Sequence, residues 1–75
     1  MPANDYQHTA IQSIKNSASR SGWILTNLGH NMNGDDAVVE IETVNRSTGK
    51  HRTQRFTIDP KGNAKSIYDY EKDLD

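Results

Sequence analysis

The chain has 75 residues, no cysteine and a formal net charge of -1 at pH 7. This length allows one domain with a small core, the lack of cysteine excludes a disulfide framework and thiolate metal sites, and the near-neutral charge lacks the basic signature of nucleic-acid-binding domains. Only thirteen of the 75 residues are Ile, Leu, Val or Phe. This share is below the level of about one fifth of the chain at which disorder becomes a concern.

Disorder also requires a high net charge, so we expect a folded, marginally stable single domain over residues 1–75. A protein partner or self-association would supply the burial that the small core lacks. The first thirteen residues contain no cationic segment followed by an apolar run, and no window approaches 18 apolar residues. We therefore expect a cytoplasmic protein with no membrane contact.

Residues 4–21 are predicted to form an amphipathic helix, because apolar side chains recur at spacings of three and four: Tyr6, Ala10, Ile11, Ile14 and Ala18. Asn4 is suited to cap the first turn, with Gln7 returning a side-chain bond to it. Gly22 suits the left-handed residue that ends a helix, after which Trp23 would fold back against the last turn.

The segments WILTNL and AVVEIETV are predicted strands, rich in β-branched and aromatic residues. The second alternates, with Ala37, Val39 and Ile41 on one face and Glu40 and Glu42 on the other. Between the two strands lies an Asn-Gly pair at 33–34, a strong hairpin signal.

The register of this first hairpin depends on its turn. A tight two-residue turn would place Leu28 opposite Val39 and Ile24 opposite Thr43. The face of the glutamates would then carry three apolar side chains: Trp23, Leu25 and Val44. A longer loop would reverse that assignment, and both registers remain open.

A second hairpin is predicted at the four-residue loop RSTG, residues 46–49. Pairing Asn45 with Lys50 extends into a ladder whose apolar residues meet on one face and whose other face sets acid against base. The predicted pairs are Ile41 with Gln54, Val39 with Phe56, Ala37 with Ile58, Glu40 with Arg55, and Glu42 with Thr53.

The last segment follows a DPKG turn, in which Pro60 and Gly62 supply the required dihedral angles. The spacing of Ala64, Ile67 and Tyr70 favours a short helix capped by Asn63 or Ser66, with a fourth strand over NAKSIY as the alternative. The predicted fold class is α+β: an N-terminal helix packed on a three- or four-stranded antiparallel β-meander, followed by a short C-terminal helix (αβββα).

The first candidate site is the cation cluster at the tip of the second hairpin. Because Arg55 is expected to pair with Glu40, the free members are Arg46, Lys50, His51 and Arg52. They could bind nucleic acid or an acidic protein weakly, but no aromatic residue is interleaved to provide a stacking platform. The alternative is a solvated hairpin tip.

The second candidate site is an apolar patch around Trp23. In the tight-turn register, Trp23, Leu25 and Val44 would lie on the sheet face away from the helix, as a protein-binding surface with a charged rim. The alternative places Trp23 in the core beneath the helix.

Metal and catalytic sites find little support. Asn31, Asn33, Asp35 and Glu42 superficially match a calcium loop, but glycine falls at the fourth position instead of the sixth. His8, His30 and His51 lack ligand spacing, and no nucleophile or phosphate motif is present. We expect no enzyme activity, no metal and no cofactor.

Two family resemblances each cover most of the chain. The order of elements resembles the double-stranded-RNA-binding domain, and KGNAKSIYDYEKDL is similar to the start of that family's last helix, although Gly62 and Asn63 interrupt its basic run. TAIQSIKNSASRSGW, VVEIETVNRSTGK and RFTIDPKGNAKSI are similar to the PepSY module, which would imply a binding or inhibitory role, usually outside the cytoplasm. Both rest on common residue types, and we assign neither.

The sequence favours a small non-catalytic protein-binding module. In size it resembles the inhibitors and adaptors that phages and mobile elements encode, which is a comparison of type only. The alternative is a weak RNA- or DNA-binding domain that uses the basic hairpin tip.

Overall fold

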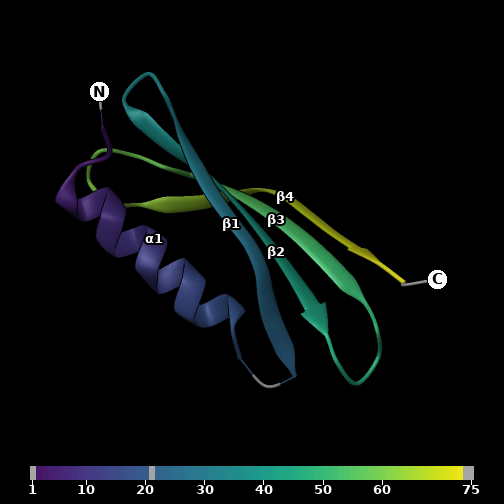
Figure 1. Cartoon of the computed structure of the whole chain (residues 1–75). Coiled ribbons are helices and arrows are strands. Elements are labelled where there is room, and N and C mark those ends of the chain that lie inside the picture. Colours follow the sequence, from purple (N-terminus) through teal and green to yellow (C-terminus); the bar gives the residue numbers. More distant parts are fainter. Residues whose placement is uncertain (1, 21, 74–75) are drawn as a thin grey trace.

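A computed structural model describes residues 2–20 and 22–73, which form one helix and four strands (Figure 1). The elements are α1 (Asp5–Ala18), β1 (Trp23–Asn33), β2 (Asp36–Asn45), β3 (His51–Ile58) and β4 (Ala64–Lys72). The strands form an antiparallel sheet in the order β1-β2-β3-β4, and α1 packs against β1 and β2. The α+β class and the N-terminal helix on a β-meander are confirmed.

The start of α1 is the one that the sequence predicts. The Asn4 side chain accepts from the Gln7 backbone N–H, and the Gln7 side chain accepts from the Asn4 backbone N–H, as in a capping box. The predicted range 4–21 was too long, because α1 ends at Ala18 and Ser19 is its C-cap. Residue 21 lies outside the described residues. Gly22 has the predicted left-handed conformation, with a φ of 82°. It lies in the turn that leads to β1 and not at the end of α1.

The apolar stripe of α1 also differs from the prediction at its first turn. Tyr6 is 70% exposed, whereas Gln7 is 1% exposed. Gln7 stands four residues before Ile11 and seven before Ile14, so it shares their face. Its side-chain amide donates to the backbone oxygens of Asp35 (2.8 Å) and Ile58 (3.1 Å).

The second hairpin has the predicted register throughout. All five predicted pairs occur, among them Val39 with Phe56 and Glu40 with Arg55. The loop closes through the Asn45 N–H, which donates to the Lys50 oxygen (2.8 Å), with Gly49 at a φ of 75°. The side chain of Asn45 also accepts from two backbone N–H groups of the loop.

The first hairpin turns one residue later than predicted. Its turn residues are Gly34, with a φ of 64°, and Asp35, while Asn33 pairs with Asp36. Glycine at the first central position suits a two-residue hairpin turn. Leu28 consequently lies opposite Ile41, not Val39.

A β-bulge at Thr26 decides which face Trp23 occupies. Pairing shifts between Leu25, opposite Thr43, and Asn27, opposite Glu42. Because the extra residue inverts the alternation of side chains, Trp23 and Leu25 lie on the face covered by α1. The tight-turn register would have placed both residues on the face of the glutamates, and that placement was wrong.

The predicted C-terminal helix was wrong, because residues 64–72 form a fourth strand, β4. β4 pairs with β3 from Ile58 opposite Ala64 to His51 opposite Lys72, with a bulge at Ile67. The free edge of β3 offers backbone partners to this segment, and its Ile and Tyr residues favour strand. The turn before it is the predicted one, with Gly62 at a φ of 89°.

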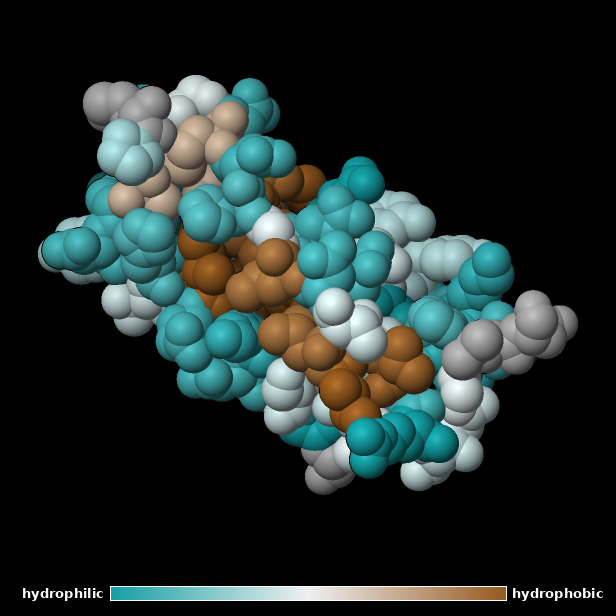
Figure 2. All heavy atoms as spheres, viewed as in Figure 1, coloured by the Kyte–Doolittle hydropathy of each residue, from teal (hydrophilic) through white to brown (hydrophobic). Residues whose placement is uncertain are grey.

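The core lies between α1 and the sheet and is small. Hydrophobic residues form a band where α1 meets the sheet (Figure 2). The buried hydrophobic side chains are Ile11, Ala37, Val39, Ile41 and Ile58. The alternation predicted for β2 is therefore the pattern that builds the core.

Candidate functional site

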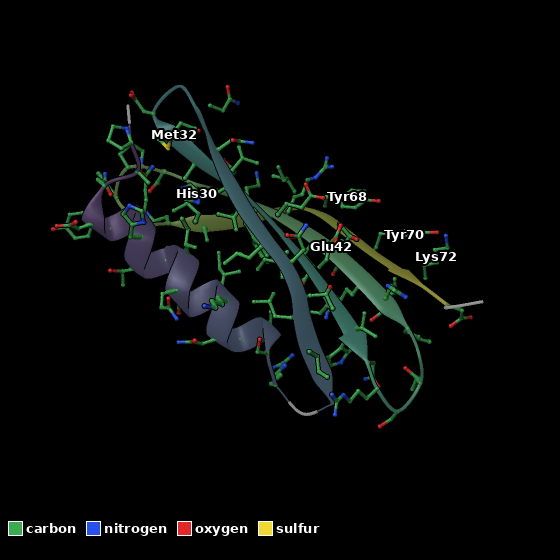
Figure 3. All side chains as sticks on the ribbon, in the orientation of Figure 1. His30, Met32, Glu42, Tyr68, Tyr70 and Lys72 are labelled. Carbon is green, nitrogen blue, oxygen red and sulfur yellow. The ribbon has the colours of Figure 1, made fainter. Side chains whose placement is uncertain are left out.

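The sheet has one face under α1 and one face that no element among residues 2–20 and 22–73 covers. We call the second the open face. Figure 3 shows Tyr68, Tyr70 and Lys72 along β4, on the side of the sheet away from α1. From the strand pairing and the alternation of side chains, the open face includes Ile24, Val38, Glu40, Glu42, Val44, His51, Thr53, Arg55, Thr57, Lys65, Tyr68, Tyr70 and Lys72, together with the β1 positions Asn27, Gly29 and Asn31.

Two aromatic residues of β4 are exposed on the open face. Tyr68 and Tyr70 are 44% and 51% exposed, and their rings stack with centroids 6.4 Å apart. The guanidinium carbon of Arg55 lies 5.4 Å from the centroid of Tyr68, within the range of a cation–π contact. Arg55 also pairs with Glu40 at 3.5 Å, so this predicted pair is confirmed.

Two hollows on the open face flank these tyrosines. One, of about 320 Å³, has Glu42, His51, Tyr70 and Lys72 among its lining residues. The other includes the bulge residue Ile67, which is 52% exposed. The open face therefore combines exposed apolar side chains with two hollows.

The bulge at Ile67 also segregates the charges of β4. Before the bulge, Lys65 lies opposite Thr57 on the open face. After it, the tyrosines and Lys72 share that face, while Asp69 and Glu71 point to the face of α1. β4 is thus aromatic and cationic on one side and acidic on the other.

The predicted cation cluster is smaller in the structure. Arg52 donates two hydrogen bonds to the carboxylate of Asp69, at 2.9 and 2.8 Å. These bonds lower the pKa of Asp69 below its usual value and raise the pKa of Arg52. The expectation that Arg52 is free was wrong, because its partner belongs to the segment predicted as a helix. Arg46 is exposed and Lys50 is half-buried.

Trp23 and Arg52, predicted as members of separate sites, line one groove on the face of α1. The groove has a volume of about 320 Å³, and Ile14, Ala18 and Phe56 also line it. Trp23 is half-buried and lies near the last turn of α1, as the sequence predicts for the start of β1. Of the two positions predicted for Trp23, the structure agrees better with the one beneath the helix than with the one in an uncovered patch on the opposite face.

The residues of the calcium-like pattern lie on the first hairpin and at Glu42 of β2. Within residues 2–20 and 22–73, no three His, Asp or Glu side chains are grouped closely enough to hold a metal ion. The rings of His8 and His30 are 6.0 Å apart, a contact between α1 and β1 that their sequence spacing does not signal. No helix in the described part of the chain has the length and apolar character needed to cross a membrane.

Comparison with protein-family models, curated proteins and solved structures gives no significant match to this chain. Neither resemblance drawn from the sequence gains support from these comparisons. The case for a function therefore depends on the surface itself.

Proposed function

We propose that this chain is a small non-catalytic protein-binding module, of the inhibitor or adaptor type, that binds its partner through the open face and β4. The observation that carries the proposal is where the exposed apolar residues lie. Among the described residues, five large hydrophobic side chains are exposed, and four of them lie on β4 or the open face: Ile24, Ile67, Tyr68 and Tyr70.

The energetics of these side chains fit an interface. A tyrosine that is half exposed has roughly 100 Å² left to bury, worth about 2.5 kcal/mol at about 25 cal/mol per Å². That burial energy is comparable with the level of about 2 kcal/mol that defines an interface hot spot. Around Tyr68 and Tyr70, the charged pair of Arg55 and Glu40 and the cation of Lys72 would form a polar rim.

A photo-crosslinking experiment tests the proposal. A benzophenone amino acid replaces Tyr70 in one variant and Tyr6 in the matched control, because Tyr6 is the exposed tyrosine on α1. In cells that natively contain this protein, we expect a discrete protein adduct from position 70 only. Excess unmodified protein should compete for it, whereas a Tyr68→Ala/Tyr70→Ala variant should not. Equal labelling from both positions would refute the proposal.

Single-stranded nucleic acid is a second candidate ligand, favoured by one observation. The fourth strand brings Tyr68 and Tyr70 beside Arg55, Lys72 and His51, which supplies the aromatic platform that the cation cluster lacks in the sequence. Against it, Glu40 already pairs with Arg55, and Glu42 lies on the same face.

Fluorescence anisotropy with labelled oligo-uridine and oligo-thymidine separates the two candidates. Under our proposal, neither oligonucleotide binds appreciably at 50 mM salt, where electrostatic binding is strong. Binding that disappears in the Tyr68→Ala/Tyr70→Ala variant and weakens steeply with salt would replace the protein ligand with a nucleic acid.

A further inference from the structure

β4 is a free edge of the sheet. It pairs with β3 on one side, and no described strand lies on its other side. All nine of its residues are exposed. Since an edge strand presents a row of unpaired backbone N–H and C=O groups, β4 is a ready template for one more strand.

The opposite edge, β1, differs from β4 in its surroundings. α1 packs against β1, and the side chains of Leu25, Leu28 and Met32 pack against the core from that strand. On β4, by contrast, residues 67–70 include three of the five exposed large hydrophobic side chains among the described residues: Ile67, Tyr68 and Tyr70. β4 is thus the edge where an added strand would cover apolar side chains.

The charges of β4 specify the chemistry of that strand. A partner strand alongside residues 68–72 would meet Tyr68, Tyr70 and Lys72 on the open face, and Asp69 and Glu71 on the other. Cross-strand pairs of opposite charge stabilise a sheet, and like charges directly opposite destabilise it. The complementary strand is therefore apolar and acidic on one side and basic on the other.

A second copy of this chain fits that edge poorly. Two identical antiparallel strands related by a two-fold axis pair symmetrically. Centred on Asp69, Tyr70 or Glu71, such a pair would set Asp69 against itself, Asp69 against Glu71, or Glu71 against itself. Like charges would then face each other on the side of α1.

We propose that β4 binds an extended segment of a partner protein by strand addition, and that this segment alternates acidic or apolar residues with basic ones. The inference rests on the proposed protein-binding function and adds how the partner is recognised. Main-chain hydrogen bonds supply affinity in this mode, and alternate side chains supply specificity. The tyrosines would cover the apolar residues of the segment, and Glu71 would pair with one of its basic residues. Asp69, whose carboxylate already accepts two hydrogen bonds from Arg52, would accept from another basic residue through its remaining lone pairs.

Two synthetic peptides test the inference by NMR titration of the full chain. The matched peptide, Thr-Glu-Lys-Val-Arg-Ile-Thr, places in antiparallel pairing its Glu opposite Lys72 and its Lys and Arg opposite Glu71 and Asp69. The control peptide, Thr-Lys-Glu-Val-Glu-Ile-Thr, reverses each charge. We expect the matched peptide to bind at least about tenfold more tightly, from three charged cross-strand pairs, and to slow amide exchange in β4.

A charge-reversing substitution provides the second arm. Glu71→Lys should weaken the matched peptide by about fivefold and strengthen the control peptide, because one cross-strand pair changes sign. Asp35→Lys makes the same charge change in the turn between β1 and β2, at the other end of the sheet, and should alter neither affinity.

The possible results separate this inference from the function on which it rests. Equal affinities for the two peptides, or no binding of either, would overturn strand addition, while crosslinking from position 70 decides the proposed function independently. Peptide binding that needs the tyrosines but leaves the β4 amides unprotected would also overturn strand addition. In that case the side chains of the open face, and not the backbone edge of β4, would bind the peptide. Concentration-dependent protection of β4 without peptide would assign the edge to a second copy.

Discussion

Gln7 joins three parts of the fold, so replacing it by leucine should destabilise the whole domain. Its side-chain amide donates to the Asp35 and Ile58 oxygens, and its side-chain oxygen accepts from the Asn4 N–H. Each bond contributes about 1 kcal/mol net, and a buried carbonyl left without a partner costs about 1 to 3 kcal/mol. Allowing for the added burial of leucine, we expect a loss of about 2 to 4 kcal/mol.

This loss is large for a domain of 75 residues, whose total stability should be about 4 to 11 kcal/mol. Urea unfolding followed by Trp23 fluorescence measures it, and Gln12→Leu, at an exposed position of α1, is the control, with an expected change below about 0.5 kcal/mol. A Gln7→Leu variant as stable as the wild type would refute the reasoning.

Gln7→Glu tests the same site through pH. A carboxylate has no donor for the two carbonyl oxygens, and burial raises the pKa of a carboxyl group. A raised pKa in the folded state means that stability is retained at low pH and lost as the pH rises through that pKa. The Glu variant should therefore be closer to wild type at pH 4 than at pH 7.

Two further predictions concern the turn before β4 and the ion pair between Arg52 of β3 and Asp69 of β4. Gly62→Ala should lower the free energy of unfolding in urea by at least about 1 to 3 kcal/mol. Gly62 has a φ of 89°, and an added Cβ would lie 3.0 Å from the Tyr6 carbonyl oxygen. Gly29→Ala is the control: nothing lies within 4 Å of a Cβ added there, so stability should be unchanged or higher. The hydrogen bonds from Arg52 lower the pKa of Asp69, so the stability that this pair contributes is present above the usual Asp pKa of about 3.9 and is lost as the pH falls through the lowered value. Thermal unfolding of wild type and Asp69→Asn between pH 2 and 6 should converge at the acid end, and parallel curves would contradict the assignment.

The middle of the fold could be predicted from sequence because several local signals agree there. The alternation of β2, the four-residue loop and the apolar residues of β3 all specify one register, and the structure has that register. At the C-terminal segment the signals conflict. Its apolar residues fit a helical spacing, and its Ile and Tyr residues fit a strand, so the free edge of β3 decides the outcome by offering backbone partners.

The error at the C-terminal segment also explains the error at Arg52. The sequence predicts cross-strand neighbours only for strands that it recognises, and Asp69 was assigned to a helix. Once β4 is a strand, Arg52 has a carboxylate partner, and the tyrosines join the open face. The basic tip thereby loses a free cation, and the sheet gains the aromatic surface on which the proposed function depends.

Both candidate surfaces depend on single extra residues. Without the bulge at Thr26, strict alternation would place Trp23 and Leu25 on the open face; without the bulge at Ile67, Tyr68 and Tyr70 would share the face of α1. A bulge has no strong sequence signal, because it needs only one unpaired position in an otherwise regular ladder. The two bulges therefore move the tryptophan towards the core and the tyrosines towards solvent, and this exchange makes β4, instead of the patch around Trp23, the surface best suited to bind a partner.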